Sequence, residues 1–332
     1  MSHICYLPIV CIALGTRWHS PTQLLWIDAM TAPKINPAFA AYVREEPKIS
    51  YVQPDDTWLT RHLISAIEHA FGRKHIEKIY KNLKKGPFDV GRFFTEAFGA
   101  TRIERRYRGV DPKTISDVGP LVFVANHPFG IVDGLALCDI ALQARGNFRI
   151  MIHSLLCQDR DLAPYFLPID FNLTKAAMKN NIRAKKVAQD CLEQNIPILI
   201  FPSGFVSTAD KKGFGSVVDA PWTTFAAKLI RDAKASVVPV YFPGRNRRAF
   251  HLAPHIAEPL RMALLLSEAR NRFGKPLDAV VGETLDWRAL SHYDSRQSLT
   301  NYLYRQVQSL AQTLPYTNVA DHPTRLLSIP KH

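Results

Sequence analysis

A histidine and an aspartate that could act as a catalytic pair follow an apolar run at residues 121–125. His127 comes directly after the run, and Asp133 follows six positions later, beyond bends at Pro128 and Gly130. Such a loop can fold back so that the carboxylate meets the imidazole. The carboxylate then fixes the imidazole tautomer, while the other ring nitrogen accepts a proton from a hydroxyl nucleophile. The spacing therefore predicts general-base catalysis by His127, oriented by Asp133. A plainer alternative is that Asp133 only caps the next helix and that His127 only occupies a turn.

Two other apolar runs end in residues suited to binding an anion. The run 196–201 leads into the sequence Phe-Pro-Ser-Gly at 201–204, where a glycine turn leaves backbone amides that favour a phosphate or an oxyanion. The run 236–242 leads to Arg245, and Arg149 lies within the segment 147–156. Because arginine makes bidentate contacts with phosphate and carboxylate groups, both arginines are candidates for substrate binding.

The charge balance indicates an anionic partner. The 332 residues hold 42 Lys and Arg against 29 Asp and Glu, which gives a formal net charge of +13 at pH 7. A nucleic acid, an acidic membrane surface and a phosphorylated substrate all fit this sign. No helix-turn-helix, zinc-finger or RNA-binding pattern occurs, so we expect no nucleic acid partner. The five cysteines lack metal-ligand spacing, so we expect neither a metal site nor a disulfide framework.

The first 57 residues are expected to form a lead-in to the main domain. Residues 4–14 are apolar but too short to span a bilayer, and no basic residue precedes them as it would in a signal peptide. Met30 begins a more ordinary polar start. Residues 1–29 are therefore either a mis-assigned upstream start or a short interfacial anchor. Residues 30–57 are polar and rich in proline, which is typical of an extended segment.

A basic, amphipathic helical segment is predicted at 58–118. Apolar residues recur at helical spacing over 58–80, and 61–85 contain seven Lys and Arg against two Glu. A second short helix is expected over 90–98. A segment of this kind can lie on anionic lipid headgroups, although its basic face also suits ordinary solvent exposure.

Residues 119–290 alternate between apolar strands and helices of ten to twenty residues. This alternation predicts an α/β fold with a mostly parallel central sheet flanked by helices. The catalytic core at 119–290, the helices at 58–118 and a closing helix with its tail at 291–332 would form one domain, 58–332. The predicted strands are 121–125, 196–201, 236–242 and 278–282, and the predicted helices are 135–144, 175–194, 222–233, 262–272 and 295–314.

Four short blocks, in this order, resemble the lysophospholipid and glycerol-phosphate acyltransferases. The first is Ala-Asn-His-Pro-Phe-Gly-Ile-Val-Asp-Gly at 125–134, which places five residues between His and Asp where the commonest family form has four. This longer loop looks most like the bacterial hemolysin-like branch, which includes lyso-ornithine lipid acyltransferases. The other blocks are 201–204, where Ser203 stands in the place of a common Glu, 238–246 with its Gly-Arg-Asn ending, and 280–285, where Thr284 replaces Pro.

The resemblance implies an O-acyltransferase of membrane lipid biosynthesis. Such an enzyme moves a fatty acyl group from acyl-CoA or acyl carrier protein to a lysolipid hydroxyl, of the lysophosphatidic acid or lyso-ornithine lipid type, without a further cofactor. It would work as a peripheral protein on the anionic cytoplasmic face of the inner membrane. The resemblance assigns catalysis to His127 and Asp133, and the residues proposed for substrate binding are Asn126, Phe129, Gly130, Arg149, Phe201, Pro202, Ser203, Gly204 and Arg245.

Two other functions remain open at this point. A thioesterase or lipid hydrolase could use the same His–Asp pair to activate water, although no Gly-x-Ser-x-Gly sequence occurs. A non-catalytic basic protein that binds membranes also fits the charge. Counting free fatty acid against acylated lipid would separate the hydrolase from the transferase.

Overall fold

The computed structural model divides the chain into two compact units, Met1–Lys34 and Ile35–His332. It describes residues 33–47, 50, 52, 56–70, 72–172, 174–209, 217–252 and 258–314. The interpretations of residues 1–29 and of the tail beyond 314 lie outside this part of the chain. All the elements below belong to the second unit.

A seven-stranded sheet forms the centre of the second unit, in the order β1-β7-β6-β2-β5-β3-β4. The five strands from β6 to β4 run parallel to one another, β7 pairs with β6 in the antiparallel sense, and β1 pairs parallel with β7. The predicted mostly parallel sheet is therefore confirmed. The strands are β1 Glu104–Gly109, β2 Leu121–Ala125, β3 Arg149–His153, β4 Phe166–Ile169, β5 Ile198–Ile200, β6 Ser236–Tyr241 and β7 Pro276–Val281.

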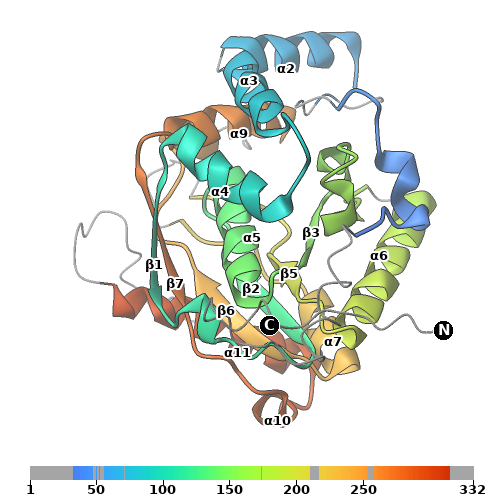
Figure 1. The fold of residues 1–332 in the computed structure, drawn as a ribbon, viewed down its shortest axis with the longest axis vertical. Helices are drawn as coiled ribbons and strands as arrows, with labels where there is room; N and C mark the ends of the chain where they lie inside the picture. Colours follow the sequence, from blue (N-terminus) through green and yellow to red (C-terminus); the bar gives the residue numbers. More distant parts are fainter. Residues whose placement is uncertain are drawn as a thin grey trace, which may run out of the picture. The chain divides into compact units, whose positions relative to one another are not determined.

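Helices cover both faces of this sheet (Figure 1). Helices α4 and α5 pack on one face, and α6, α7 and α11 pack on the other. The helices are α2 Trp58–Ala70, α3 Arg73–Leu83, α4 Val90–Thr101, α5 Ile131–Arg145, α6 Lys175–Glu193, α7 Phe225–Ala233, α8 Arg248–Leu252, α9 Glu258–Asn271, α10 Trp287–Leu290 and α11 Arg296–Ser309. Short 3₁₀ helices are η3 Pro37–Tyr42, η4 Pro112–Thr114, η5 Ser154–Leu156, η6 Ala163–Tyr165 and η8 Leu310–Thr313.

The apolar strands are buried on both faces because each face carries helices. In β2, Phe123 packs into the core beneath α4 and α5, whereas Val122 and Val124 pack into the core beneath α6, α7 and α11. Alternating side chains thus enter two different cores, and every residue of β2 is buried. This arrangement explains why the strand has a continuous apolar sequence instead of an alternating one.

The predicted helix over 58–80 is divided into two helices at Gly72. This glycine has a φ of 104°, and a Cβ atom there would lie 2.5 Å from Cδ of Arg270 on α9. The positive φ is what favours glycine here, because the Arg270 side chain is flexible. Helices α2 and α3 therefore turn back on each other and pack on α9, as Figure 1 shows.

The segment before α2 differs from the extended lead-in expected at 30–57. Asn36 caps η3 by accepting a hydrogen bond from the Ala38 amide, and Phe39 of this turn is buried in the core beneath α6. The Arg44 amide donates to the Gln158 carbonyl at 2.9 Å. Residues 36–44 are thus attached to the main body. Within the described residues, no helix is both long and apolar enough to cross a bilayer.

Candidate active site

The carboxyl ends of β2, β5 and β6 meet at one edge of the sheet. These three strands are neighbours and run parallel, so the loops that follow them emerge side by side. The loops carry His127 after β2, Phe201 after β5, and Arg245 with Asn246 after β6. Sequence positions up to 119 residues apart are thus collected at a single place.

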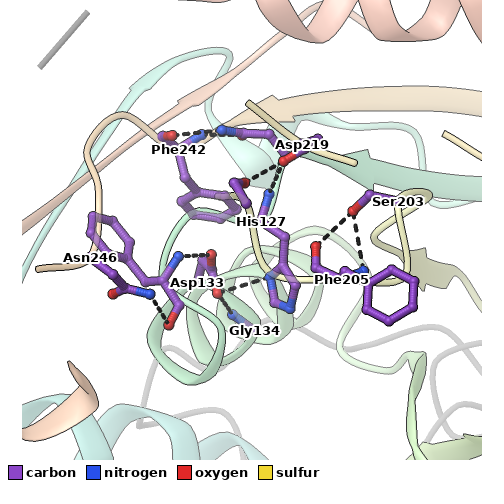
Figure 2. Close-up of polar contacts among 11 residues, drawn as sticks. His127, Asp133, Gly134, Ser203, Phe205, Asp219, Phe242 and Asn246 are labelled. Atoms are coloured by element: carbon purple, nitrogen blue, oxygen red, sulfur yellow. Dashed lines mark hydrogen bonds and ion pairs between the residues drawn. The ribbon is translucent and has the colours of Figure 1, made fainter. Parts of the chain in front are cut away.

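His127 and Asp133 face each other across the loop that joins β2 to α5. The Nδ1 atom of His127 lies 3.2 Å from Oδ1 of Asp133, and their side chains are 16 % and 0 % exposed (Figure 2). Nδ1 is buried and its N–H direction is not aligned with the carboxylate, so the contact is an ion-pair distance and not a well-directed hydrogen bond.

Asp133 is held in place by two backbone amides. Its Oδ2 accepts from the Phe129 amide at 2.8 Å, and its Oδ1 accepts from its neighbour Gly134 at 2.9 Å. Asp133 is not the N-cap residue, because α5 begins at Ile131 and Gly130, with a φ of 87°, is its N-cap residue. Asp133 lies in the first turn of the helix, with its carboxylate directed back toward the loop that carries His127.

Asn126 joins the end of β2 to the end of β6. Its Nδ2 donates to the Phe242 carbonyl at 2.8 Å, and its Oδ1 accepts from the Phe242 amide at 2.7 Å. Both ends of the buried side-chain amide are therefore used within the fold. These contacts give Asn126 a structural role, which is to fix the two strand ends beside His127. Its role in substrate binding stays a prediction.

Two phenylalanines of the predicted site pack around the catalytic loop. The ring of Phe201 stacks on the imidazole of His127, with centroids 3.8 Å apart and an interplanar angle of 21°. Phe129 is buried, and its ring lies beneath Gly244, where an added Cβ would come within 2.6 Å of it. Phe201 therefore contacts the imidazole of His127 itself, whereas Phe129 packs against Gly244 in the loop that follows β6.

The turn at 201–204 satisfies most of its own hydrogen bonds. The Gly204 amide donates to the Phe201 carbonyl at 2.9 Å, and the buried Ser203 hydroxyl donates to the Phe205 carbonyl at 2.9 Å. The carbonyl of buried Pro202 accepts from the Thr223 amide. Since the Gly204 amide already has a partner, it is a poorer oxyanion donor than its sequence position suggested. Ser203 acts here as a bridge within the turn.

The two candidate arginines lie at opposite edges of the sheet. Arg245 is half-buried and follows β6 at the edge that carries His127. Arg149 is the first residue of β3 and pairs with Ile198, the first residue of β5. It therefore lies at the amino ends of the parallel strands, away from His127. Its guanidinium donates to Asn147 and to the Phe148 carbonyl. The structure thus does not bring Arg149 to His127, and its predicted contact with substrate is not supported.

Asp219 is a functional candidate that the sequence analysis missed. It lies in the segment between β5 and α7, and its carboxylate accepts a hydrogen bond from the His127 amide at 3.2 Å (Figure 2). It also accepts hydrogen bonds from the Ser207 hydroxyl and from Trp222 Nε1, the latter at 2.9 Å. Burial raises the pKa of the Asp219 carboxyl, and the hydrogen bonds from Ser207 and Trp222 oppose that rise. No sequence motif marks this residue, which is 92 positions from His127.

No group of three or more His, Cys, Asp or Glu side chains that could hold a metal ion occurs in the described part of the chain. The described site offers a histidine base, a buried carboxylate and a stacked aromatic ring. A proton acceptor of this kind, set at the carboxyl ends of parallel strands, is typical of an enzyme that activates a hydroxyl group.

Comparison with known proteins identifies the family. The acyltransferase family model matches residues 59–292, and the chain belongs to this family. The protein is therefore an acyltransferase. A lyso-glycine lipid O-acyltransferase of Phocaeicola vulgatus is 28 % identical over 242 residues, which cover 70 % of this chain and 81 % of the relative.

A second relative and one solved structure are also similar to the chain. A lyso-glycine lipid O-acyltransferase of Bacteroides thetaiotaomicron is 29 % identical over 181 residues, 51 % of this chain and 62 % of the relative. The solved 1-acyl-sn-glycerophosphate acyltransferase of Thermotoga maritima has a TM-score of 0.46 and 13 % identity, over 78 % of this chain and 99 % of that one.

Proposed function

We propose that the protein transfers a fatty acyl group from a thioester, either acyl-CoA or acyl carrier protein, to the hydroxyl of a lysolipid. The observation that carries this proposal is the 3.2 Å approach of His127 Nδ1 to the buried carboxylate of Asp133. In that arrangement the carboxylate orients the ring and stabilises the imidazolium, and Nε2 is the nitrogen left to accept a proton. Within the described residues, Nε2 makes no hydrogen bond to the protein.

The proposed reaction needs no covalent intermediate with the enzyme. Nε2 of His127 takes the proton of the lysolipid hydroxyl as its oxygen bonds to the thioester carbonyl carbon. The carbon–sulfur bond then breaks, and the thiolate receives the proton from the imidazolium. The negative oxygen of the tetrahedral intermediate would lie near the amino end of α5, where Gly130 is the N-cap residue and backbone amides favour negative charge.

The acceptor is proposed to be a lysolipid with an anionic headgroup. The two relatives named above are lyso-glycine lipid O-acyltransferases, and the loop 125–134 resembles the lyso-ornithine lipid branch. Arg245, half-buried just beyond β6, is the proposed headgroup contact because its guanidinium suits a carboxylate or a phosphate. Lysophosphatidic acid therefore belongs in the same assay as the amino-acid lysolipids.

We place the protein at the cytoplasmic face of the inner membrane as a peripheral protein. Helix α2 exposes three large apolar side chains, Trp58, Leu59 and Leu63, of which Trp58 is 72 % exposed. The formal charge of +13 would add attraction to anionic headgroups. An exposed apolar set on a basic helical segment is typical of an interfacial helix that lies on a lipid surface.

The test is an acyl-transfer assay with the purified protein. Radiolabelled acyl-CoA or acyl carrier protein is supplied with a panel of lyso-glycine, lyso-ornithine and lysophosphatidic lipids, and labelled products are separated. We expect labelled acylated lipid from the wild type and none from His127→Ala. Labelled free fatty acid as the main product, in the presence of every acceptor, would instead establish a hydrolase.

A further inference from the structure

Asp219 holds the backbone of His127 from a distant part of the chain. Its Oδ1 accepts both the His127 amide at 3.2 Å and the Ser207 hydroxyl, while its Oδ2 accepts Trp222 Nε1 at 2.9 Å. Ser207 adds a second contact, because its own amide donates to the His127 carbonyl at 2.8 Å. Both polar backbone groups of His127 are thus engaged by the segment that follows β5.

A carboxylate is a costly residue to use at this position. Asp219 is half-buried and its carboxyl is desolvated, and within the described part of the chain no lysine or arginine forms an ion pair with it. A desolvated charge without an ion-pair partner is unfavourable unless hydrogen bonds compensate for it. Asp219 has three hydrogen bonds, and one of them goes to the catalytic loop. A neutral side chain could form hydrogen bonds with Ser207 and Trp222 at a smaller desolvation cost. The presence of a carboxylate therefore needs a further reason.

We infer that Asp219 is a positioning residue of the acyl-transfer reaction: it fixes the His127 backbone so that the imidazole lies between Asp133 and the ring of Phe201. This inference rests on the proposed function. The ring is set on one side by the 3.2 Å approach to Asp133 and on its face by stacking at 3.8 Å. Neither contact controls the backbone, which follows β2 and precedes a proline that donates no hydrogen bond. Asp219 and Ser207 supply that control.

The substitution Asp219→Asn breaks this arrangement in a defined way. If Oδ1 of the new asparagine faces the His127 backbone N–H and the Ser207 hydroxyl, its Nδ2 faces Trp222 Nε1, and both of these groups are donors. If the side chain turns over, Nδ2 faces the His127 backbone N–H, which is also a donor. One donor is left without an acceptor in either orientation. Trp222→Phe removes the indole donor, so in the double variant the oxygen can face His127 again.

We expect Asp219→Asn to lower kcat roughly 10²-fold while leaving KM for both substrates unchanged, because displacement of a catalytic group affects the reaction step and not binding. Trp222→Phe alone should lower the unfolding temperature and leave kcat near the wild-type value. The double variant should regain most of the lost kcat. A matched control is Asp232→Asn on α7, where the carboxylate pairs with Lys185 and Lys228 away from the site. Asp232→Asn should leave kcat unchanged.

Hydrogen–deuterium exchange supplies a readout that does not depend on activity. Asp219→Asn should speed exchange in peptides that span 121–135, which contain the His127 amide, and Asp232→Asn should not.

Wild-type kcat or unchanged exchange in Asp219→Asn overturns the inference, as does an equal loss of kcat in Trp222→Phe. If Asp219→Asn does not fold, Ser207→Ala takes its place with an expected kcat loss of roughly tenfold, and wild-type kcat there overturns it. A wild type that transfers no acyl group refutes the proposed function, while the exchange result still reports whether Asp219 holds His127.

Discussion

Oδ1 of Asp133 lies 3.2 Å from Nδ1 of His127 and also accepts the Gly134 amide at 2.9 Å. With Oδ2 bound to the Phe129 amide, the carboxylate has a fixed orientation before the imidazole approaches it. The carboxylate of the pair thus lies in the first turn of α5, and the histidine lies in the loop before it. Asp219 accepts the His127 amide from the segment that follows β5, on the other side of the loop.

Asp133→Asn is expected to lower kcat by about 10²–10⁴-fold. The asparagine keeps the size of the side chain but replaces one acceptor oxygen with a donor, so either the Phe129 amide or the pair Gly134 and His127 loses its partner. Activity is measured at saturating substrate, alongside thermal unfolding.

The matched control for Asp133→Asn is Asp139→Asn, two turns further along α5. Asp139 is also buried, and it binds Arg105, Tyr107 and Gln143 instead of the catalytic loop. The control should be destabilised by a comparable amount, about 1–3 kcal/mol, with little loss of kcat at temperatures where it stays folded. Equal kcat losses in the two variants would remove the special role of Asp133.

The sequence predicted the four strands β2, β5, β6 and β7 and missed β1, β3 and β4. β2, β5, β6 and β7 are apolar runs, and the residues of each were recognisable from composition alone. β1 has the sequence Glu-Arg-Arg-Tyr-Arg-Gly and pairs on one side only, so it carries almost no apolar signal. β4 contains a proline, which argues against a strand unless the strand lies at an edge, as β4 does.

The same limits explain which site residues were placed correctly. His127 and Asp133 are close in sequence, so their meeting follows from one loop. Arg149 was misplaced because β3 was not recognised, and the first residue of a parallel strand lies at the edge opposite the site. Asp219 could not be found from spacing, since its contact with His127 joins residues 92 positions apart. A contact of that kind depends on how the loops pack, and no local pattern encodes it.

Gly244→Ala is expected to destabilise the protein by about 1–3 kcal/mol and to lower activity with it. This glycine has a φ of 114°, and a Cβ atom would lie 2.6 Å from the ring of Phe129, which supports the catalytic loop. The control is Gly99→Ala in α4, where the backbone is helical and nothing lies within 4 Å of the added atom. It should stabilise the protein by up to about 1 kcal/mol. Chemical denaturation of both variants measures the difference, and a stabilised Gly244→Ala would contradict the prediction.

The stability of the fold should decrease as the pH falls below about 6.5, and His153 at the end of β3 should contribute to this decrease. Burial lowers the pKa of His153, and the charge of Asp170 opposes that effect. The unfolded chain takes up a proton at this histidine near pH 6.5, whereas the folded chain does so only at lower pH. Unfolding therefore binds a proton within this window, and the free energy of unfolding falls as pH drops through it.

His153→Asn tests this assignment, because its side-chain oxygen can replace Nδ1, which accepts the Leu155 amide at 3.2 Å, without titrating. Urea unfolding at a series of pH values should give a shallower slope below pH 6.5 for the variant. The same slope in variant and wild type would assign the decrease to other groups.

Replacing Trp58, Leu59 and Leu63 with serine should release the protein from lipid vesicles. These side chains are exposed on α2, and removing an apolar side chain from a lipid contact costs about 1.5–3 kcal/mol when burial is complete. Partial burial of three such groups still predicts a loss of at least tenfold in vesicle affinity, roughly 1.4 kcal/mol. Co-sedimentation with anionic vesicles measures this loss, and added salt should weaken wild-type binding because the basic charge contributes to it.

Met178 and Ile182 on α6 provide the control, since they are each 65 % exposed and their double serine variant should bind as the wild type does. If the α6 variant lost binding and the α2 variant kept it, the lipid-facing surface would be α6, beside the loop that carries Phe171.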